Sequence, residues 1–139
     1  MLEINIDGAS RGNPGLSAIG ITIKNNGQTI IKHGEFIGTR TNNQAEYEAL
    51  KKALELCKGM DNELIVLSDS ELLINQRNLK YKIRNQQLKE ISREISQLEK
   101  NYMKITYRRI PRGKNTEADK MANKALDEHL RNNILKGMN

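Results

Sequence analysis

The sequence has few of the features that mark secreted, membrane-spanning or disulfide-stabilised proteins. Among its 139 residues there is a single cysteine, Cys57, which excludes an intramolecular disulfide framework. Nowhere do about 18 apolar residues run together, and the segment Met1–Asn5 lacks the charged and apolar regions of a secretory signal. We therefore expect a cytoplasmic protein that does not span a membrane, with Cys57 as a buried thiol on the apolar face of a helix.

Internal repeats and low-complexity tracts are also absent. A chain of this length most simply forms one domain, because it is long enough to build a sheet covered by helices without a metal or disulfide staple. We predict a single domain over residues 1–130 and a frayed C-terminal tail over residues 131–139. We also expect a monomer.

Negative charge is scarce in one part of the chain. The net charge is +6, but residues 1–79 hold 8 basic and 10 acidic side chains, whereas residues 80–114 hold 11 basic and 3 acidic ones. Interspersed glutamates make Lys89–Lys100 look like an ordinary solvated helix. The excess of positive charge in the rest of residues 80–114 favours an anionic partner, such as the phosphates of a nucleic acid. The residues that we expect to bind phosphates are Lys80, Lys82 and Arg84.

Hydrophobic periodicity predicts an α/β fold. Alternating or continuous apolar residues predict strands over residues 2–6, 19–23, 29–38, 63–67 and 104–110, with an Asn-Gly turn between the second and third. Helices are predicted from a capping box at Thr41 and Gln44 to about Lys58, after Ser70, over residues 86–100, and from residue 116 onward. These elements predict a mixed five-stranded sheet flanked by helices, with a three-strand antiparallel meander plus two parallel strands.

Four acidic residues occupy comparable positions in these elements. Asp7 and Asp69 follow the first and fourth strands, while Glu46 and Asp119 lie in the first turns of helices. Each has an ordinary alternative, such as capping a turn or facing a helix dipole. If the first and fourth strands are neighbours, however, Asp7 and Asp69 converge at the end of the sheet, where α/β proteins place their sites.

Clustered carboxylates repel one another unless some are protonated or a hard cation balances them. The two histidines and Cys57 form no cluster that could bind zinc, so oxygen ligands favour Mg²⁺ or Mn²⁺. A pair of such ions is the usual device for cleaving phosphodiesters. The segment Asp7–Gly15, with its glycines and an Asn-Pro step, is predicted to be a tight turn that a polyanion could approach closely.

Four motifs together resemble the type-1 ribonuclease H family: DGASRGNPG, TNNQAEYEAL, SDS followed by ELLINQ, and IPRGKNTEADKMANKA. The resemblance extends to about residue 130. It implies hydrolysis of the RNA strand of RNA–DNA hybrids to 3′-hydroxyl and 5′-phosphate products with two ions of Mg²⁺ or Mn²⁺. It implies that the metal ligands are Asp7, Glu46, Asp69 and Asp119. Contacts to the hybrid are expected from Gly8, Arg11, Asn13, Asn42, Asn43, Gln44, Ser70 and Asn115.

The chain departs from the family pattern in two places. Many members carry a catalytic histidine before the last acid, whereas residues 111–115 offer Arg112 instead, and many bacterial relatives insert a basic, tryptophan-containing handle that this chain lacks. We expect Arg112 to take a catalytic role. Two alternatives stay open: a non-catalytic nucleic-acid-binding module of the same fold, and a relative of the same superfold that acts on DNA. Double-stranded RNA stays open as a further substrate.

Overall fold

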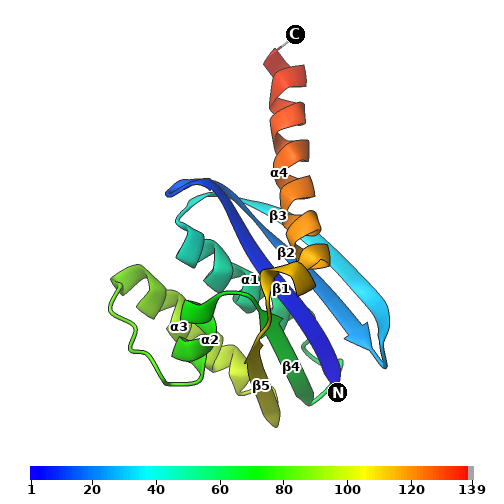
Figure 1. Cartoon of the computed structure of the whole chain (residues 1–139), viewed down its shortest axis with the longest axis vertical. Helices are drawn as coiled ribbons and strands as arrows, with labels where there is room; N and C mark the ends of the chain where they lie inside the picture. The colour runs from blue at the N-terminus through cyan, green and yellow to red at the C-terminus, as the bar shows by residue number, and fades with distance from the viewer. Residues whose placement is uncertain (138–139) are drawn as a thin grey trace.

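The computed structural model describes residues 1–137, and its centre is a five-stranded sheet in the order β3-β2-β1-β4-β5 (Figure 1). The strands are β1 (Leu2–Gly12), β2 (Gly15–Asn25), β3 (Gln28–Arg40), β4 (Glu63–Ser68) and β5 (Lys104–Arg109). The helices are α1 (Asn42–Leu56), α2 (Glu71–Arg77), α3 (Gln86–Glu99), the short 3₁₀ helix η1 (Arg112–Lys114) and α4 (Thr116–Gly137). β1, β2 and β3 pair antiparallel, and β4 and β5 run parallel to β1. The predicted fold is confirmed.

Local sequence signals explain where several elements begin. The Thr41 hydroxyl accepts a hydrogen bond from the backbone N–H of Gln44, and the Gln44 side chain accepts one from the N–H of Thr41, so the predicted capping box is confirmed. Asn26 and Gly27 both have positive φ, 51° and 78°, as a tight hairpin between β2 and β3 requires. Ser70 caps α2 through a bond from the N–H of Leu73, also as predicted.

Strand β1 is longer than the predicted 2–6, and this changes the position of Asp7. β2 pairs with the glycine-rich stretch as far as Gly12, opposite Gly15, so Asp7 lies inside the antiparallel ladder rather than at the end of a strand. The parallel pairing between β1 and β4 ends earlier, at Asn5 opposite Leu67. Asp7 therefore lies just beyond the point where β1 and β4 separate, and most of the predicted glycine-rich turn is strand.

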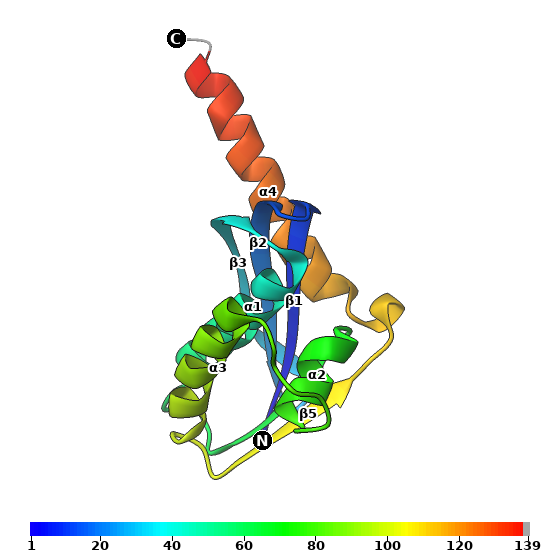
Figure 2. The same ribbon diagram turned by 90° about the vertical axis from the view of Figure 1, so that its left-hand side faces the viewer.

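The core lies between the sheet and α1, with α1 and α3 on one face and α4 on the other (Figure 2). Helix α1 and its C-terminal cap bury one apolar face in this core, and Cys57 lies on it as predicted. The fully buried members of this face are Ala45, Ala49, Leu50, Ala53, Leu54 and Cys57. Cys57 is a free thiol, and burial raises its pKa to about 12. Through residue 137, no helix combines the length and apolar character that a membrane crossing needs.

Helix α4 runs without a break to Gly137, where we had predicted a frayed tail from Arg131. Its last buried side chain is Leu126, and beyond it the helix projects past the sheet (Figure 1). No break marks the predicted domain boundary at residue 130. Residues 138 and 139, the end of the predicted tail, lie outside the described residues.

Candidate active site

Three of the predicted acids meet where β1 and β4 separate. Asp7, Glu46 and Asp69 each offer a carboxylate oxygen, and these oxygens lie within 4.8 Å of one another. Asp119 lies outside this triad, but its side chain is close enough to Asp7 to raise the pKa of that carboxyl. All four acids line one cleft of about 510 Å³. The structure thus brings together carboxylates from β1, α1, α4 and the end of β4.

Glycines in the sheet allow two helices to approach closely enough to deliver their acids. A methyl group on Gly8 would lie 2.3 Å from the carbonyl carbon of Ala45, so only glycine lets the first turn of α1 rest on β1 with Glu46 directed at Asp7. On the opposite face, a methyl group on Gly20 would lie 1.9 Å from the carbonyl oxygen of Ala118 in α4. Gly20 is the cross-strand partner of Asp7, so α4 sits directly beside that carboxylate.

Asn115 differs from our expectation that it contacts substrate. It is only 1% exposed, and its amide nitrogen donates to the carbonyl oxygen of Ile6 at 2.8 Å and to Oδ2 of Asp69 at 3.5 Å. Its Oδ1 accepts a bond from Asn5 at 3.1 Å. Substrate cannot reach a side chain that is buried and saturated in this way. Asn115 instead bridges the gap between β1 and the carboxylate that follows β4.

Asp7 and Glu46 are held in an environment that opposes their charge. Burial first, then the hydrogen bond with Asp119 and repulsion from Asp69 and Asp119, raise the pKa of Asp7 to about 8. Burial and repulsion from Asp7 and Asp69 also raise the pKa of Glu46 well above its usual range. Among the described residues, Oε2 of Glu46 is buried without a hydrogen-bond partner. An oxygen-only donor set with an unsatisfied buried oxygen fits a hard divalent cation.

The predicted substrate-binding residues fall into two groups. Gly8, Arg11 and Asn42 line the cleft, as does Arg112. The others lie outside the lining of the cleft: Asn13, Asn43, Gln44, Ser70, Lys80, Lys82, Arg84 and Asn115.

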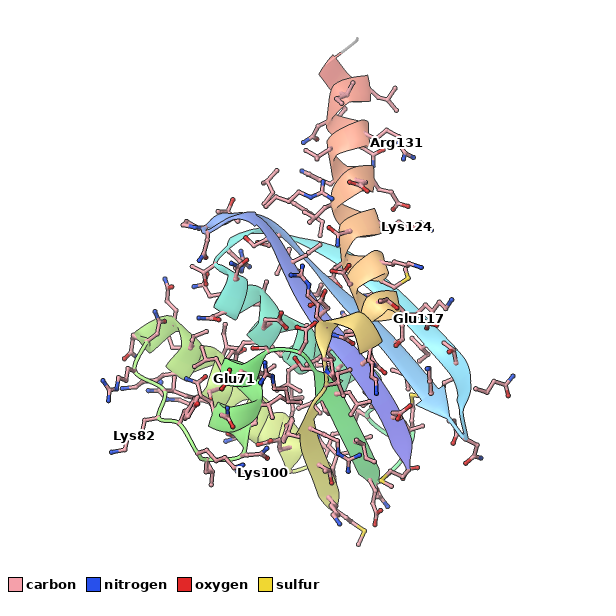
Figure 3. The ribbon with its side chains drawn as sticks, in the orientation of Figure 1. Glu71, Lys82, Lys100, Glu117, Lys124 and Arg131 are labelled. Carbon is pink, nitrogen blue, oxygen red and sulfur yellow. The ribbon has the colours of Figure 1, made fainter. Side chains whose placement is uncertain are left out.

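Within the second group, some side chains are free and others are engaged. Asn13 accepts a bond from the N–H of Asn42 at 3.0 Å, and Asn43 is exposed. The Gln44 amide is engaged by the capping box and by Gln87, and the Ser70 hydroxyl by its cap. Lys80, Lys82 and Arg84 are exposed on the loop between α2 and α3, and the Lys82 side chain points outward from it (Figure 3).

Among the cleft-lining residues that were missed in the sequence are Arg109 and Asn123. Arg109 ends β5, and its guanidinium lies 3.8 Å from Glu71. Asn123 lies four residues after Asp119 on α4, a spacing that puts both side chains on one face of a helix. That spacing was a signal for Asn123, whereas Arg109 could be found only from the position of β5 in the sheet.

Comparisons with known proteins agree with this architecture. The sequence family described as "Reverse transcriptase-like" matches residues 5–125. The bifunctional protein Rv2228c of Mycobacterium tuberculosis is 34% identical over 127 residues, which are 89% of this chain and 35% of that protein. The chain therefore spans about a third of the length of this curated relative.

Two solved structures are also similar over nearly their whole length. The crystal structure of RNase H1 from the halophilic archaeon Halobacterium salinarum NRC-1 has a TM-score of 0.88 and 33% identity, with 91% of this chain and 98% of that chain covered. The crystal structure of LC11-RNase H1 in complex with an RNA/DNA hybrid has a TM-score of 0.89 and 36% identity, with 94% and 99% covered.

Proposed function

The chain belongs to the type-1 ribonuclease H family, and we propose that it hydrolyses the RNA strand of RNA–DNA hybrids, leaving 3′-hydroxyl and 5′-phosphate ends. The observation that carries this proposal is the meeting of Asp7, Glu46, Asp69 and Asp119 in one cleft. LC11-RNase H1, which is 36% identical, was crystallised with an RNA/DNA hybrid, and this supports the choice of substrate. All four acids come from one copy of the chain, so the acidic part of the cleft is complete without a second copy.

The four carboxylates are the groups that would hold two divalent cations, Mg²⁺ or Mn²⁺. When bound, such ions supply activation of the attacking water and charge neutralisation at the scissile phosphate. Glu46 and Asp7 provide the buried part of the donor set, and their raised pKa values reflect burial first and then repulsion between the acids, both of which a cation offsets. Asn115 keeps the Asp69 carboxylate in place beside them.

Amide side chains near the first turn of α1 would distinguish RNA from DNA. An amide can both donate to and accept from a 2′-hydroxyl, the group that distinguishes RNA from DNA. Asn43 is exposed and Asn42 lines the cleft, so both are free to make this contact. Asn13 supports the site by accepting a bond from the N–H of Asn42, and Gln44 by completing the cap of α1.

Arg112 takes the place of the family histidine at the rim of the cleft. It is exposed, begins η1, and lines the same cleft as the acids. A guanidinium stays protonated and therefore cannot act as a general base, but it donates two parallel hydrogen bonds to a phosphate. Its role is to stabilise charge on the scissile phosphate or the departing 5′-phosphate. The cations of the loop between α2 and α3 would grip the duplex backbone.

The activity is tested with a hybrid that carries a label on the 5′ end of either the RNA or the DNA strand. With Mg²⁺ we expect fragments of the RNA only. Their 5′ ends should accept a ligase-dependent adaptor without prior phosphorylation, and their 3′ ends should be extended by a polymerase. Cleavage of the DNA strand, or cyclic-phosphate ends on the RNA, would reject the proposed reaction, and binding without cleavage would indicate a non-catalytic module.

A further inference from the structure

A second asparagine, Asn123, contacts one of the four acids, and nothing in the proposed reaction yet accounts for this contact. Asn123 lies one turn after Asp119 on α4, and its amide nitrogen donates to Oδ1 of Asp119 at 3.2 Å and to the carbonyl oxygen of Asp119 at 3.0 Å. Asp119 lies outside the close triad of the other acids. Its carboxylate is instead contacted by a neighbour from its own helix.

A cation fixes the orientation of the Asn123 amide. Nη2 of Arg11, which reaches across from β1, lies 3.4 Å from Oδ1 of Asn123 and 3.5 Å from its carbonyl oxygen. An amide presents an acceptor on one side and a donor on the other. With the oxygen turned to Arg11, the nitrogen faces Asp119, and a flipped amide would turn its N–H groups against the guanidinium.

Arg11 is in turn anchored by a third residue of the same helical row. Its Nη2 donates to Oδ1 of Asp127 at 2.7 Å, and Asp127 lies four residues after Asn123. Asp119, Asn123 and Asp127 thus follow one another at successive turns of α4. Arg11 was predicted to contact substrate, but its guanidinium is already paired with Asp127 on α4.

We propose that Arg11 and Asn123 are positioning residues that hold the Asp119 carboxylate toward Asp7 and so strengthen cation binding in the cleft. This inference rests on the cation site of the proposed function. A carboxylate that is already oriented loses less freedom when it becomes a ligand, so the oriented site binds the cation more tightly. The effect acts through Asn123, since Arg11 itself carries the same sign of charge as the cation.

The sign of the effect of Arg11 separates positioning from simple electrostatics. Arg11→Met removes a positive charge near the cleft, which by charge alone tightens cation binding. Positioning predicts the opposite: Arg11→Met and Asn123→Ala should each weaken Mn²⁺ binding by about 3- to 10-fold, as expected for loss of a typical hydrogen bond. The double variant should be no weaker than either single variant, because both remove one chain of contacts.

The measurement is calorimetric titration of Mn²⁺ into the substrate-free protein, with the thermal midpoint recorded for each variant. Asn123→Ala replaces asparagine by a better helix former, so α4 should stay folded. Lys51→Met serves as the matched control, because it removes a cation that is paired with Glu94 at 2.6 Å on the surface of α1. The control should leave Mn²⁺ affinity unchanged.

The outcomes distinguish this inference from the proposed function. Weaker Mn²⁺ binding in both variants supports positioning, even if the wild type fails to cut a hybrid. Tighter or unchanged Mn²⁺ binding in Arg11→Met overturns it. If Arg11→Met keeps its Mn²⁺ affinity and still cleaves the hybrid, but with a raised KM, then Arg11 is a substrate contact. If the wild type binds no Mn²⁺, both the cation site and the positioning role fall.

Discussion

At the scale of single residues, Asp7 is a carboxylate whose charge the folded protein disfavours. Its pKa is raised from 3.8 to about 8, mainly by burial. Since the folded-state pKa lies above the unfolded one, the folded state binds the proton more tightly. The resulting stabilisation is complete below about pH 4, where the unfolded group is also protonated, and is lost as the pH rises through about 8.

Asp7→Asn should therefore change both stability and activity. In EDTA the wild type should become less stable between pH 4 and 8, and the variant should show a smaller decline because it has no proton to lose at this position. With Mg²⁺, hybrid cleavage by the variant should fall to background, because the cation site loses a formal charge. Thermal midpoints across this pH range and initial cleavage rates check the two parts. Equal pH slopes, or near-normal turnover, would remove Asp7 from the proposed role.

Arg112→Ala tests the proposed role of Arg112 in stabilising charge on the phosphate. Loss of one preorganised donor to charge developing in the transition state should lower kcat by roughly 10- to 10³-fold while KM changes little. Arg112→Lys should recover only part of the rate, since an ammonium group cannot donate in the bidentate geometry. Arg108→Ala is the control, because it removes the same charge from an exposed position of β5 that does not line the cleft. A raised KM with normal kcat would make Arg112 a binding cation only.

At the scale of elements, local sequence signals predicted where a helix begins and where a hairpin turns. Features that depend on contacts with distant parts of the chain were not predicted. The capping box at Thr41 and the Asn26–Gly27 turn depend on neighbours within a few residues, so the sequence alone was sufficient. The length of β1 depends on β2, which pairs with the glycine-rich stretch that we had interpreted as a turn. The role of Asn115 depends on Asn5, which is 110 residues away in the chain. Contacts of this range leave no periodic trace in a single sequence.

The close approach of α4 to the sheet predicts the effect of Gly20→Ala. The added methyl group would lie 1.9 Å from the carbonyl oxygen of Ala118, so the backbone of α4 must move. Overpacking of this kind costs about 1–3 kcal/mol, and the shift also carries Asp119 away from Asp7. We expect a lower thermal midpoint together with weaker Mn²⁺ binding, measured by calorimetry.

Gly137→Ala is the control for this substitution, since nothing lies within 4 Å of a methyl group at that position of the same helix. It should leave Mn²⁺ affinity unchanged. If Gly20→Ala also kept wild-type stability and Mn²⁺ affinity, the glycine would not be what places α4 beside the acids.

At the scale of the whole molecule, one group of cations lies outside the lining of the acidic cleft. Lys80, Lys82 and Arg84 are exposed on the loop between α2 and α3 (Figure 3). If this loop contacts the duplex backbone, binding of a hybrid should release counterions there. Replacing all three cations by glutamine should reduce the slope of log affinity against log salt by about 2–3, at roughly 0.9 per phosphate contact.

The salt slope is measured by hybrid titration in EDTA, so that no cleavage occurs. A matched variant with Lys24, Lys32 and Lys58 replaced by glutamine removes the same charge from β2, β3 and the segment after α1, outside the loop between α2 and α3. The matched variant should keep the wild-type slope. An unchanged slope in the loop variant would place this loop away from the substrate.

The proposed activity is tested most directly by one cleavage assay on three duplexes of the same sequence: RNA–DNA, RNA–RNA and DNA–DNA. Each is offered to the wild type and to Asp69→Asn in Mg²⁺, Mn²⁺ or EDTA. We predict that the wild type cuts the RNA of the hybrid with either cation, that EDTA abolishes the cleavage, and that Asp69→Asn is inactive in all conditions. Cleavage that persists in EDTA or in Asp69→Asn, or a hybrid that stays intact with both cations, would contradict a cation-dependent ribonuclease site at these acids.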